Sequence, residues 1–414
     1  MADERIVVTG IGVVSPLGLT ADATWESLLA GRSGVSHITA FDAEGFETTI
    51  AAEITDFDPT NYMDRKEARR ADRFSQFALA AAREALGQAD LLREEPLGDR
   101  VSSLIASGVG GIITLSEQYD VLREKGPKRI SPFLVPMMLV DMAGGNVSIT
   151  YGARGPSFAT VSACASGADA IGMGMDLIRK GEIDVAICGG AEAPICPIAV
   201  AGFNSAGALS RNNEAPEAAS RPFDALRDGF IIGEGAAVLI VERLEHALAR
   251  GARPIAELSG YGVTSDASHI TQPAPFGEGG ARAMRKAIEG AGLRPEDVDY
   301  INAHGTSTPI NDKAETDAVK SVWGDDANKV AISSSKSMTG HLLGAAGAIE
   351  SAICVMSIER GAIPPTINLT NPDPECDLDY TPHNARMTKV DVAMTNSLGF
   401  GGHNTSLLFQ RYDA

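Results

Sequence analysis

Basic residues are scarce in this chain. Its 414 residues include 35 Lys and Arg against 54 Asp and Glu, so the formal net charge is −19. A chain this acidic is repelled by nucleic acid and by anionic membranes, which argues against a general binder of either. We therefore expect no nucleic-acid partner and no membrane partner.

Long apolar runs are absent as well. No window approaches the roughly 18 uninterrupted apolar residues of a membrane span, and the most apolar stretch, residues 157–178, is broken by Asp169. The opening MADERIVVTG is acidic and short of apolar length, which is not the pattern of a signal peptide. The five cysteines form no CxxC pair, so the sequence favours reduced thiols and a cytoplasmic location over a disulfide framework or a zinc ribbon.

Nucleotide-binding loops are missing too. The stretch VTGIGVVSPLG, residues 8–18, has Ser15 where a GxGxxG fingerprint needs its third glycine, and no GxxxxGK[ST] loop occurs in the chain. We interpret residues 8–18 as a first strand and a turn, and we predict no nucleotide cofactor.

Short β-branched runs alternate with helical patterns along the whole chain. This alternation predicts an α/β protein in which helices cover a mainly parallel sheet. The predicted strands are residues 5–12, 101–108, 158–163, 184–190, 236–242, 299–304, 329–335 and 391–399, and two of the predicted helices are 72–86 and 314–324. At 414 residues, the chain is too long for one ordinary core.

A weak internal repeat favours two similar halves. Sliding the sequence by 180 positions places segment 167–181 on segment 347–361, with identities at Gly167, Ala168, Ile178 and Gly181. These few identities are weak evidence alone, but they agree with the chain length. We place the seam near residues 246–256 and predict halves of 1–251 and 252–414.

The stretch VSACASG, residues 161–167, places a lone cysteine where a strand pattern gives way to a helix pattern. A helix beginning just after Cys164 would direct free N–H groups and the positive end of its dipole at the sulfur. Both effects lower the pKa of a thiol and favour a nucleophilic thiolate. Burial in the core is the commoner fate of a cysteine, and it is the one we expect for Cys188, Cys196, Cys354 and Cys376.

Two histidines share the topological setting of Cys164. His304 lies in NAHGTSTP at the end of a predicted strand, and His341 lies in SKSMTGHLLGAAG at another passage from strand to helix. Because open α/β sheets place their sites beyond the carboxyl ends of strands, we expect both histidines in one site with the cysteine. A structural role is the alternative for each histidine taken alone.

Charged residues close to these motifs have two interpretations. Lys336 precedes the second histidine by five residues and would need a carboxylate if buried, for which Glu350 and Glu315 are the candidates. An exposed loop lysine is the alternative. Asp312 and Glu315 also fit a capping box ahead of a helix from Lys313, which is the role we expect for Asp312.

The stretch SLGFGGHN, residues 397–404, sets Phe400 inside a glycine loop. Flanking glycines permit unusual backbone angles and a close approach to a ligand. A plain turn is the alternative.

The segment DRKEARR, residues 64–70, opens a helix with a DxxE box and concentrates positive charge in an acidic chain. Its basic residues, at i,i+4 spacings, are Arg65, Lys66, Arg69 and Arg70. A solvated helix face is the usual explanation of such a run, and a dock for an acidic partner is the alternative.

Four of these motifs together identify a family. VSACASG, NAHGTSTP, SSSKSMTGHLLGAAG and NSLGFGGHN, in that order, resemble the β-ketoacyl-acyl-carrier-protein synthases of type II fatty acid synthesis, most closely the elongating synthases of the synthase II group. The resemblance extends over essentially the whole chain, including VTGIGVVSPLG and SRPFDALRDGFIIGEGA. It implies a thiolase-like fold with duplicated halves in five αβαβα layers, usually as a homodimer, and acyl carrier protein (ACP) as the partner.

Where the motifs match, the resemblance also implies catalytic roles. Cys164 would be the acyl-accepting nucleophile, and His304 and His341 would be the paired active-site histidines. Lys336 would organise the histidines. Phe400 would gate the site, and its N–H would form an oxyanion hole together with the N–H of the nucleophile.

The resemblance further implies contacts for the substrate and for an ion. Thr306 and Thr308 would hold the pantetheine arm, and the basic segment would dock ACP. No cofactor is required, but some relatives bind a monovalent cation, so a structural Na⁺ or K⁺ is expected at most. The corresponding residues here are Asn302, Glu350, Asn396 and Ser397.

The implied reaction is a decarboxylative Claisen condensation. The thiolate would take an acyl group from acyl-ACP, malonyl-ACP would lose CO₂, and the resulting enolate would attack the bound acyl group to give 3-oxoacyl-ACP. Two histidines separate the chain from initiating synthases, which use Cys-His-Asn. His403, where some relatives have threonine, leaves the subfamily open.

Three rival classes remain at the level of sequence. They are a polyketide ketosynthase, a non-catalytic chain-length-factor subunit, and a degradative thiolase. Cys164 argues against the second, and the lack of another cysteine in a matching motif argues against the third. The preferred acyl length is not encoded in any motif, and we expect the bottom of the acyl pocket near Gly111, Ile112 and Phe133.

Overall fold

Nine strands form one continuous sheet, in the order β4-β5-β6-β1-β7-β13-β12-β8-β9. The computed structural model describes residues 4–413. Residues 1–3 belong to the N-terminal segment that we expect is not a signal peptide, and they lie outside the described residues. The bounds are β1 (Ile6–Val14), β4 (Val101–Ala106), β5 (Val185–Glu192), β6 (Gly235–Arg243), β7 (Ala256–Ser265), β8 (Tyr300–Asn302), β9 (Ala331–Ser333), β12 (Val392–Gly399) and β13 (His403–Arg411).

The sheet consists of two blocks with the same internal order. In the first, β1 is antiparallel to β6, β6 is antiparallel to β5, and β5 is parallel to β4. In the second, β7, β13, β12 and β8 repeat this sequence of pairings, and β9 adds a further parallel strand. The blocks join only where Val7 and Val8 of β1 pair with Glu257 and Ala256 of β7.

The prediction of a mainly parallel sheet is therefore wrong, since five of the eight pairings are antiparallel. The reason is clearest at β12 and β13, which are joined by the short turn 400–402. Strands linked by so short a turn can only be antiparallel. Alternation of strand and helix patterns carries no information on strand direction.

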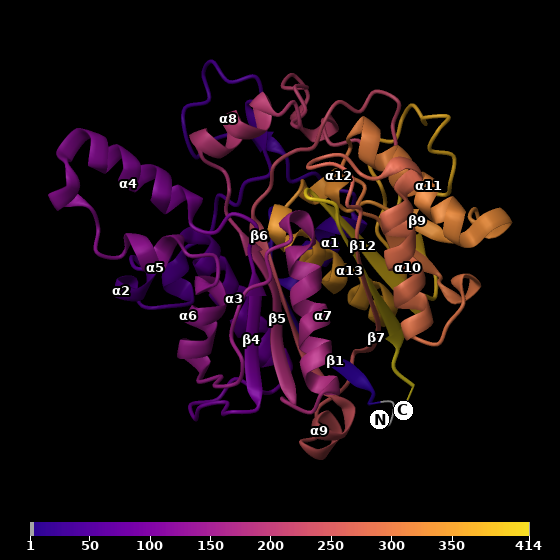
Figure 1. The fold of residues 1–414 in the computed structure, drawn as a ribbon, viewed down its shortest axis with the longest axis horizontal. Coiled ribbons are helices and arrows are strands. Elements are labelled where there is room, and N and C mark those ends of the chain that lie inside the picture. The colour runs from indigo at the N-terminus through magenta and orange to yellow at the C-terminus, as the bar shows by residue number, and fades with distance from the viewer. Residues whose placement is uncertain (1–3, 414) are drawn as a thin grey trace.

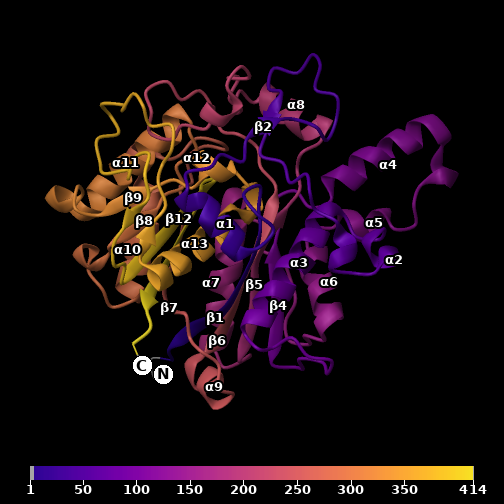
Figure 2. The ribbon, with the colours of Figure 1, turned by 180° about the vertical axis from the view of Figure 1, so that it is seen from behind.

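Helices lie in three layers around the two sheet blocks (Figures 1 and 2). On the outer faces, α3 (Arg73–Gln88) covers β1 and β6, and α10 (Glu278–Gly290) covers β7 and β13. Between the blocks, α7 (Ser166–Arg179) packs on β5 and α13 (Ala346–Arg360) packs on β12. The result is the five-layer αβαβα arrangement.

The remaining elements flank this frame. The other helices are α1 (Ala21–Leu29), α2 (Arg65–Ala68), α4 (Ile112–Lys125), α5 (Leu134–Met138), α6 (Met142–Tyr151), α8 (Pro197–Ser205), α9 (Leu244–Ala249), α11 (Pro309–Trp323) and α12 (Lys336–Thr339). The short strands are β2 (Ser36–His37), β3 (Ile50–Ala51), β10 (Ala362–Ile363) and β11 (Arg386–Met387). Across residues 4–413, no helix is both long and apolar enough to cross a membrane.

Most predicted elements are present, with one exception among the strands. The helices predicted at 72–86 and 314–324 correspond to α3 and α11. The strand predicted at 158–163 is wrong, because that segment has no ladder partner, and just before it the chain forms an isolated bridge to β4 between Ser157 and Ser103. The β-branched residues there favour an extended backbone, but no neighbouring strand within the described residues forms a ladder with it.

The duplication extends to the turns that precede the two central helices. A single 3₁₀ turn leads into each helix, Ala163–Ala165 before α7 and Leu343–Ala345 before α13. Each turn opens with a left-handed residue that carries a side chain, Ala163 (φ 52°) or Leu343 (φ 47°). The helices start at residues 166 and 346, which is the 180-residue offset of the sequence repeat. The boundary between residues 251 and 252 stays a prediction.

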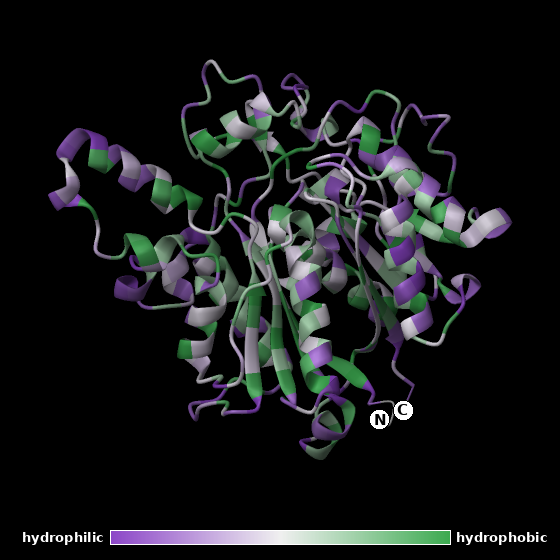
Figure 3. Cartoon of the chain, viewed as in Figure 1, coloured by the Kyte–Doolittle hydropathy of each residue, from purple (hydrophilic) through white to green (hydrophobic). Residues whose placement is uncertain are grey.

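The central layer is almost entirely buried. Every residue of α13 from Ala346 to Ile358 is buried, which suits a helix that lies between two sheets. The strands on either side are largely hydrophobic (Figure 3). Where α7 and α13 meet, glycines permit contact, since a Cβ built on Gly167 would lie 2.9 Å from the Gly344 oxygen and 3.0 Å from the Ala348 Cβ.

Gly167→Ala should lower the free energy of unfolding by about 1–3 kcal/mol, because the added methyl overpacks this helix contact. Gly290→Ala is the matched control, since a Cβ there meets nothing within 4 Å. It should raise the free energy by about 0.5–1 kcal/mol by removing glycine from a helix. Urea titrations with unchanged m-values measure both, and a loss of equal size in the two variants would contradict the packing argument.

Candidate active site

One cavity of about 520 Å³ collects the residues singled out in the sequence. Cys164 comes from the turn before α7, His304 follows β8, and His341 follows α12. Thr306, Thr308 and Phe400 line the same cavity. Residues from both halves of the chain thus converge on one space between the sheet blocks.

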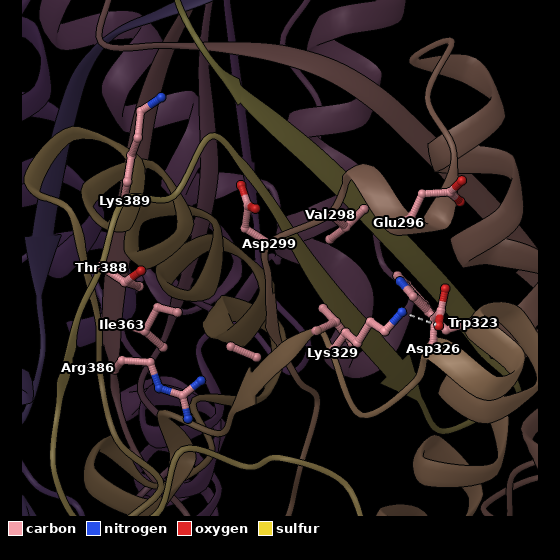
Figure 4. A pocket seen from close by; sticks show the side chains of 12 residues that line it. Glu296, Val298, Asp299, Trp323, Asp326, Lys329, Ile363, Arg386, Thr388 and Lys389 are labelled. Atoms are coloured by element: carbon pink, nitrogen blue, oxygen red, sulfur yellow. Dashed lines mark ion pairs between the residues drawn. The ribbon is translucent and has the colours of Figure 1, made fainter.

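A second hollow of about 270 Å³ lies beside β9 and β11 and contains none of these residues. Figure 4 shows Lys329 directed at Asp326, 2.7 Å away. The other two basic side chains in the hollow, Arg386 and Lys389, are each paired with an aspartate of the chain. Its charges are satisfied internally, so we place the candidate active site in the larger cavity.

The Cys164 sulfur is enclosed by hydrogen-bond donors. The Nε2 atom of His341 lies 3.1 Å from Sγ, and the Phe400 N–H also points at the sulfur. Burial raises the pKa of the thiol to about 11, although the Lys336 charge and the Phe400 N–H act to lower it. The expectation of a depressed pKa is therefore not met, because loss of water around the sulfur outweighs the nearby positive groups.

The two histidine rings lie nearly perpendicular, with centroids 5.3 Å apart. Both are 2% exposed. Burial, then the nearby Lys336 ammonium, holds the pKa of each imidazole well below 6.5. Both rings are therefore neutral at physiological pH, and each carries one N–H donor and one acceptor nitrogen.

Hydrogen bonds on the far side of each ring place that proton. The Leu343 N–H donates to Nδ1 of His341 at 3.2 Å, and the Lys336 Nζ lies 3.4 Å from Nδ1 of His304. Since Nδ1 accepts in both rings, the proton of each ring resides on Nε2. In His341 that Nε2–H donates to the cysteine sulfur.

This proton placement also bears on whether Cys164 and the two histidines would bind a metal ion. The ligand atoms of Cys164, His304 and His341 lie within 4.8 Å of one another, a spacing that could hold a metal ion. A histidine that binds metal through Nε2 donates a proton from Nδ1 to a neighbouring acceptor. Here both Nδ1 atoms face donors, so the pair is arranged to give hydrogen bonds rather than to coordinate.

Lys336 is 2% exposed and forms an ion pair with the fully buried Glu350. Burial raises the pKa of Glu350 to about 7, and the Lys336 charge opposes that rise. Glu315, the other candidate partner, instead accepts the N–H groups of His304 at 2.9 Å and Gly305 at 2.8 Å. Each carboxylate thus supports a different part of the histidine pair.

The four residues of the expected cation site are all buried, and two of their side-chain oxygens have no hydrogen-bond partner among the described residues. Within residues 4–413, Glu350 Oε2 and Ser397 Oγ lack a hydrogen-bond partner. A Cβ on Gly347 would lie 2.8 Å from Ser397 Oγ, and Gly347 shares a helix face with Glu350 three residues on. Orphaned buried oxygens of this kind suit a small cation.

The cavity walls include residues that no motif indicated. Gly108, Val109 and Phe203 line it, whereas Gly111 and Ile112 do not. Phe133 lies elsewhere, in the hollow formed by the basic segment. The lining of this cavity does not define where a bound acyl chain would end, so the position of the pocket bottom stays a prediction.

The four basic residues of segment 64–70 are exposed and surround a hollow of about 400 Å³ with Phe133 beneath. Asp64 caps the helix by accepting two backbone N–H groups, as the DxxE box indicated. However, α2 is a single turn that ends at Ala68, so the i,i+4 spacing does not apply. Within residues 4–413, none of the four pairs with an acid.

Asp312 does not cap a helix. The helix α11 begins at Pro309, which places Asp312 in its first turn. There Asp312 is fully buried, accepts the Phe223 N–H at 2.9 Å and lies 3.5 Å from Arg227. The capping-box interpretation is wrong because the proline extends the helix one turn earlier than expected.

Comparison with known families places the chain. The model of the β-ketoacyl synthase N-terminal domain matches residues 3–247, and that of the C-terminal domain matches residues 255–370. The chain belongs to the β-ketoacyl synthase family. Two relatives are 3-oxoacyl-[acyl-carrier-protein] synthase 2 of Synechocystis sp., 51% identical over 409 residues (99% of this chain, 98% of the relative), and of Staphylococcus aureus, 50% identical over 412 residues (100% and 99%).

Solved structures agree with this assignment. A β-ketoacyl synthase from Burkholderia phymatum is 38% identical with a TM-score of 0.92, over 99% of this chain and 100% of that chain. A ketosynthase bound to a hexaketide, in complex with a type II polyketide-synthase ACP, is 36% identical with a TM-score of 0.91, over 99% and 100%. The predicted thiolase-like fold of the family is confirmed.

The buried ion pair of this synthase generates a stability prediction. Lys336→Met leaves the Glu350 carboxylate without its partner, and breaking a buried pair costs about 3–5 kcal/mol. The pKa of Glu350 is already above its usual range, and losing Lys336 raises it further. The folded state then holds a proton that the unfolded state releases, so the loss of stability should grow as pH rises.

The double variant Lys336→Met/Glu350→Gln should regain most of that loss, since no uncompensated charge remains. Urea unfolding of both variants and the wild type at acidic and neutral pH measures the effect. A loss for Lys336→Met that is independent of pH would show that Glu350 is not the charge responsible.

Proposed function

We propose that this chain is a β-ketoacyl-ACP synthase, which condenses malonyl-ACP with a cysteine-bound acyl chain in type II fatty acid elongation. The observation that carries the proposal is the cysteine sulfur 3.1 Å from a histidine Nε2, in a cavity where both histidines present Nε2–H groups. A thiol nucleophile beside two neutral donors suits a reaction that forms an enolate without a metal or a redox cofactor.

In the first half-reaction, Cys164 takes the acyl group. The His341 Nε2–H and the Phe400 N–H stabilise the thiolate, which attacks the thioester carbon of acyl-ACP. The tetrahedral oxyanion is stabilised by the N–H groups of Cys164 and Phe400, and one such donor contributes about 3–4 kcal/mol. The C–S bond to ACP then breaks, the ACP sulfur leaves and takes up the proton that the Cys164 thiol gave up, and the acyl group remains as a thioester of the enzyme.

In the second half-reaction, malonyl-ACP occupies the cavity. The bond from its terminal carboxylate to the methylene carbon breaks, CO₂ departs, and the electron pair becomes an enolate. His304 and His341 each donate an Nε2–H to the enolate oxygen. The methylene carbon attacks the acyl-cysteine carbonyl, which releases the Cys164 thiolate and gives 3-oxoacyl-ACP two carbons longer. Thr306 and Thr308, whose hydroxyls lie 3.0 Å apart on the cavity wall, bind the pantetheine arm.

ACP docks on the basic segment, residues 64–70. The relatives are named for acting with ACP, and one structural neighbour is a ketosynthase in complex with its ACP. Arg65, Lys66, Arg69 and Arg70 supply exposed positive charge on a chain of net charge −19. An acidic carrier would be repelled by most of this surface and attracted here.

The active form is a cytoplasmic homodimer. Apolar side chains stand exposed over α4, α5 and the neighbouring loop, and a second copy would cover them. They are Leu115 (48% exposed), Leu122 (41%), Val135 (56%), Leu139 (41%), Phe158 (37%) and Val161 (58%). A structural Na⁺ or K⁺ would be held by Asn302, Glu350, Asn396 and Ser397, where its charge would satisfy the orphaned oxygens.

A polyketide ketosynthase is the second candidate, because one structural neighbour carries a polyketide-synthase ACP and a hexaketide. The two functions differ in the acyl chain that they extend. Products from malonyl-ACP and a graded series of saturated acyl-ACPs distinguish them, since a fatty acid synthase adds one unit to saturated chains. Loss of those products in favour of poly-β-keto chains would support the polyketide assignment.

Cys164→Gln should abolish condensation but retain decarboxylation, because its amide carbonyl resembles the acyl-thioester while the histidines remain. Adding His304→Ala or His341→Ala should lower CO₂ release on the order of 10²-fold, since each removes a donor to the enolate oxygen. Release of ¹⁴CO₂ from labelled malonyl-ACP measures each step.

The same assay has a pH test. Because the pKa of both histidines lies well below 6.5, release by Cys164→Gln should be constant from that pH upward through neutrality. A titration centred near 6.5, or undiminished release after loss of both histidines, would contradict the roles given to the pair.

Reversing charge with Lys66→Glu/Arg69→Glu should raise the KM for acyl-ACP and flatten its salt dependence, because steering by exposed charge is screened by salt. Small pantetheine thioesters should react almost as before. Lys180→Glu/Arg253→Glu, which changes net charge equally at exposed sites outside the basic segment, should leave KM nearly unchanged. Equal effects on ACP and pantetheine substrates would place the dock elsewhere.

A further inference from the structure

Glu192 ends β5 and is completely buried, but it does not line the cavity. Its two carboxylate oxygens accept four hydrogen bonds. Oε1 accepts from Ser107 Oγ at 2.6 Å and the Val109 N–H at 3.2 Å. Oε2 accepts from the Gly108 N–H at 2.7 Å and the Gly344 N–H at 2.8 Å. The last of these bonds crosses from the first half of the chain to the second.

Gly344 occupies in the second half the position that Cys164 occupies in the first. Each is the second residue of a 3₁₀ turn, and each follows a left-handed residue, Leu343 or Ala163. The N–H at this position in the first half belongs to the proposed oxyanion hole. In the second half this residue is a glycine, so no nucleophilic side chain is present. Its N–H donates a hydrogen bond to the Glu192 carboxylate.

The second turn nevertheless contacts the active site through its first residue. The Leu343 N–H donates to Nδ1 of His341 at 3.2 Å, the bond that keeps the proton of this ring on Nε2. A left-handed conformation is costly for a branched residue and persists only where the surroundings fix it. The next N–H, that of Gly344, donates to Glu192 at 2.8 Å, and this bond restrains the turn in that conformation.

We propose that Glu192 is a positioning residue for the decarboxylation half-reaction: by holding Gly344, it keeps the Leu343 N–H on His341 and so maintains the Nε2–H that stabilises the enolate. This role rests on the proposed function, because it assigns the residue to one of the two half-reactions described there.

A carboxylate is specifically required in this position. All four partners are donors, and Ser107 Oγ itself accepts the Gly110 N–H at 2.9 Å, which directs its hydroxyl proton to Glu192. Glutamine would bring an NH₂ group against N–H donors, because it has only one acceptor oxygen. The contact is also closely packed, since a Cβ on Gly344 would lie 2.6 Å from Glu192 Oε2 and 2.2 Å from the Gly108 nitrogen.

The two half-reactions should respond differently to a change here. Acylation depends on Cys164 and the Phe400 N–H, which belong to the other turn and to the loop after β12, and it uses the His341 Nε2–H only as a second donor to the sulfur. Decarboxylation depends on the direction of the His341 Nε2–H. A merely structural residue would lower both rates together, so the ratio of the two rates identifies a positioning role.

The test compares Glu192→Gln with the wild type in single-turnover acylation, followed by mass spectrometry of the Cys164 peptide, and in condensation with malonyl-ACP. We expect condensation to fall on the order of 10²-fold, the scale of a misdirected catalytic group, and acylation to fall much less, because the Phe400 N–H remains at the sulfur. In the Cys164→Gln background, Glu192→Gln should lower ¹⁴CO₂ release to a similar extent.

Glu84→Gln is the matched control, because Glu84 also accepts two backbone N–H groups, from Val13 at 2.8 Å and Ala21 at 2.9 Å, but does not line the cavity. It should lower the unfolding midpoint and leave the ratio of condensation to acylation unchanged. If Glu192→Gln does not fold, Gly344→Ala breaks the same contact from the other side and should change the same ratio.

An unchanged ratio in Glu192→Gln, or an equal fall in both rates, would overturn the positioning role, as would failure of both variants to fold. This outcome is separate from failure of the proposed function. If Cys164→Gln releases no CO₂, the enolate mechanism itself is wrong, whereas the ratio measured in enzyme that keeps Cys164 judges Glu192 alone.

Discussion

The contact between the N-termini of α7 and α13 is the constraint on which the site depends. Both helices are enclosed between two sheet blocks, and they approach closely because Gly167, Gly344 and Gly347 lack side chains at the contact. This approach brings two equivalent turns together at one place. One turn presents a thiol, and the other fixes a histidine next to it, so the catalytic group of each half lies within reach of the other.

Removal of water governs the chemistry at this contact. It raises the pKa of the Cys164 thiol and lowers that of His304 and His341, which would impair a site that relied on a charged imidazole. The arrangement instead uses neutral rings as donors and fixes their protons from behind. Lys336 supplies a positive charge beside both rings and is paired with Glu350, so the cavity presents directed N–H groups next to a balanced ion pair.

The sequence motifs predicted the active-site residues more accurately than the sequence patterns predicted the strand directions of the sheet. Cys164, His304 and His341 each lie at or soon after the end of a predicted strand, and such positions meet at one edge of a sheet, so their proximity could be inferred. Strand direction could not, because antiparallel β13 follows the same kind of apolar pattern as a parallel strand. Segment 158–163 reads as a strand for the same reason, although no partner lies beside it. Glu192 was missed although it lies two residues beyond a predicted strand, in GGAEA, because a carboxylate held by one serine hydroxyl and three backbone N–H groups resembles any other acidic residue in sequence.

The junction between the sheet blocks has a consequence for motion. Backbone pairing of β1 with β7 joins the two halves into one sheet, and the shared helix layer is locked by contacts without room for sliding. The halves therefore have no hinge, and an enzyme built in this way cannot close around its substrate by domain movement. Under the proposed function, admission of the two ACP-bound substrates would fall to short loops at the cavity mouth, such as the turn containing Phe400, while the reacting groups stay at fixed separations.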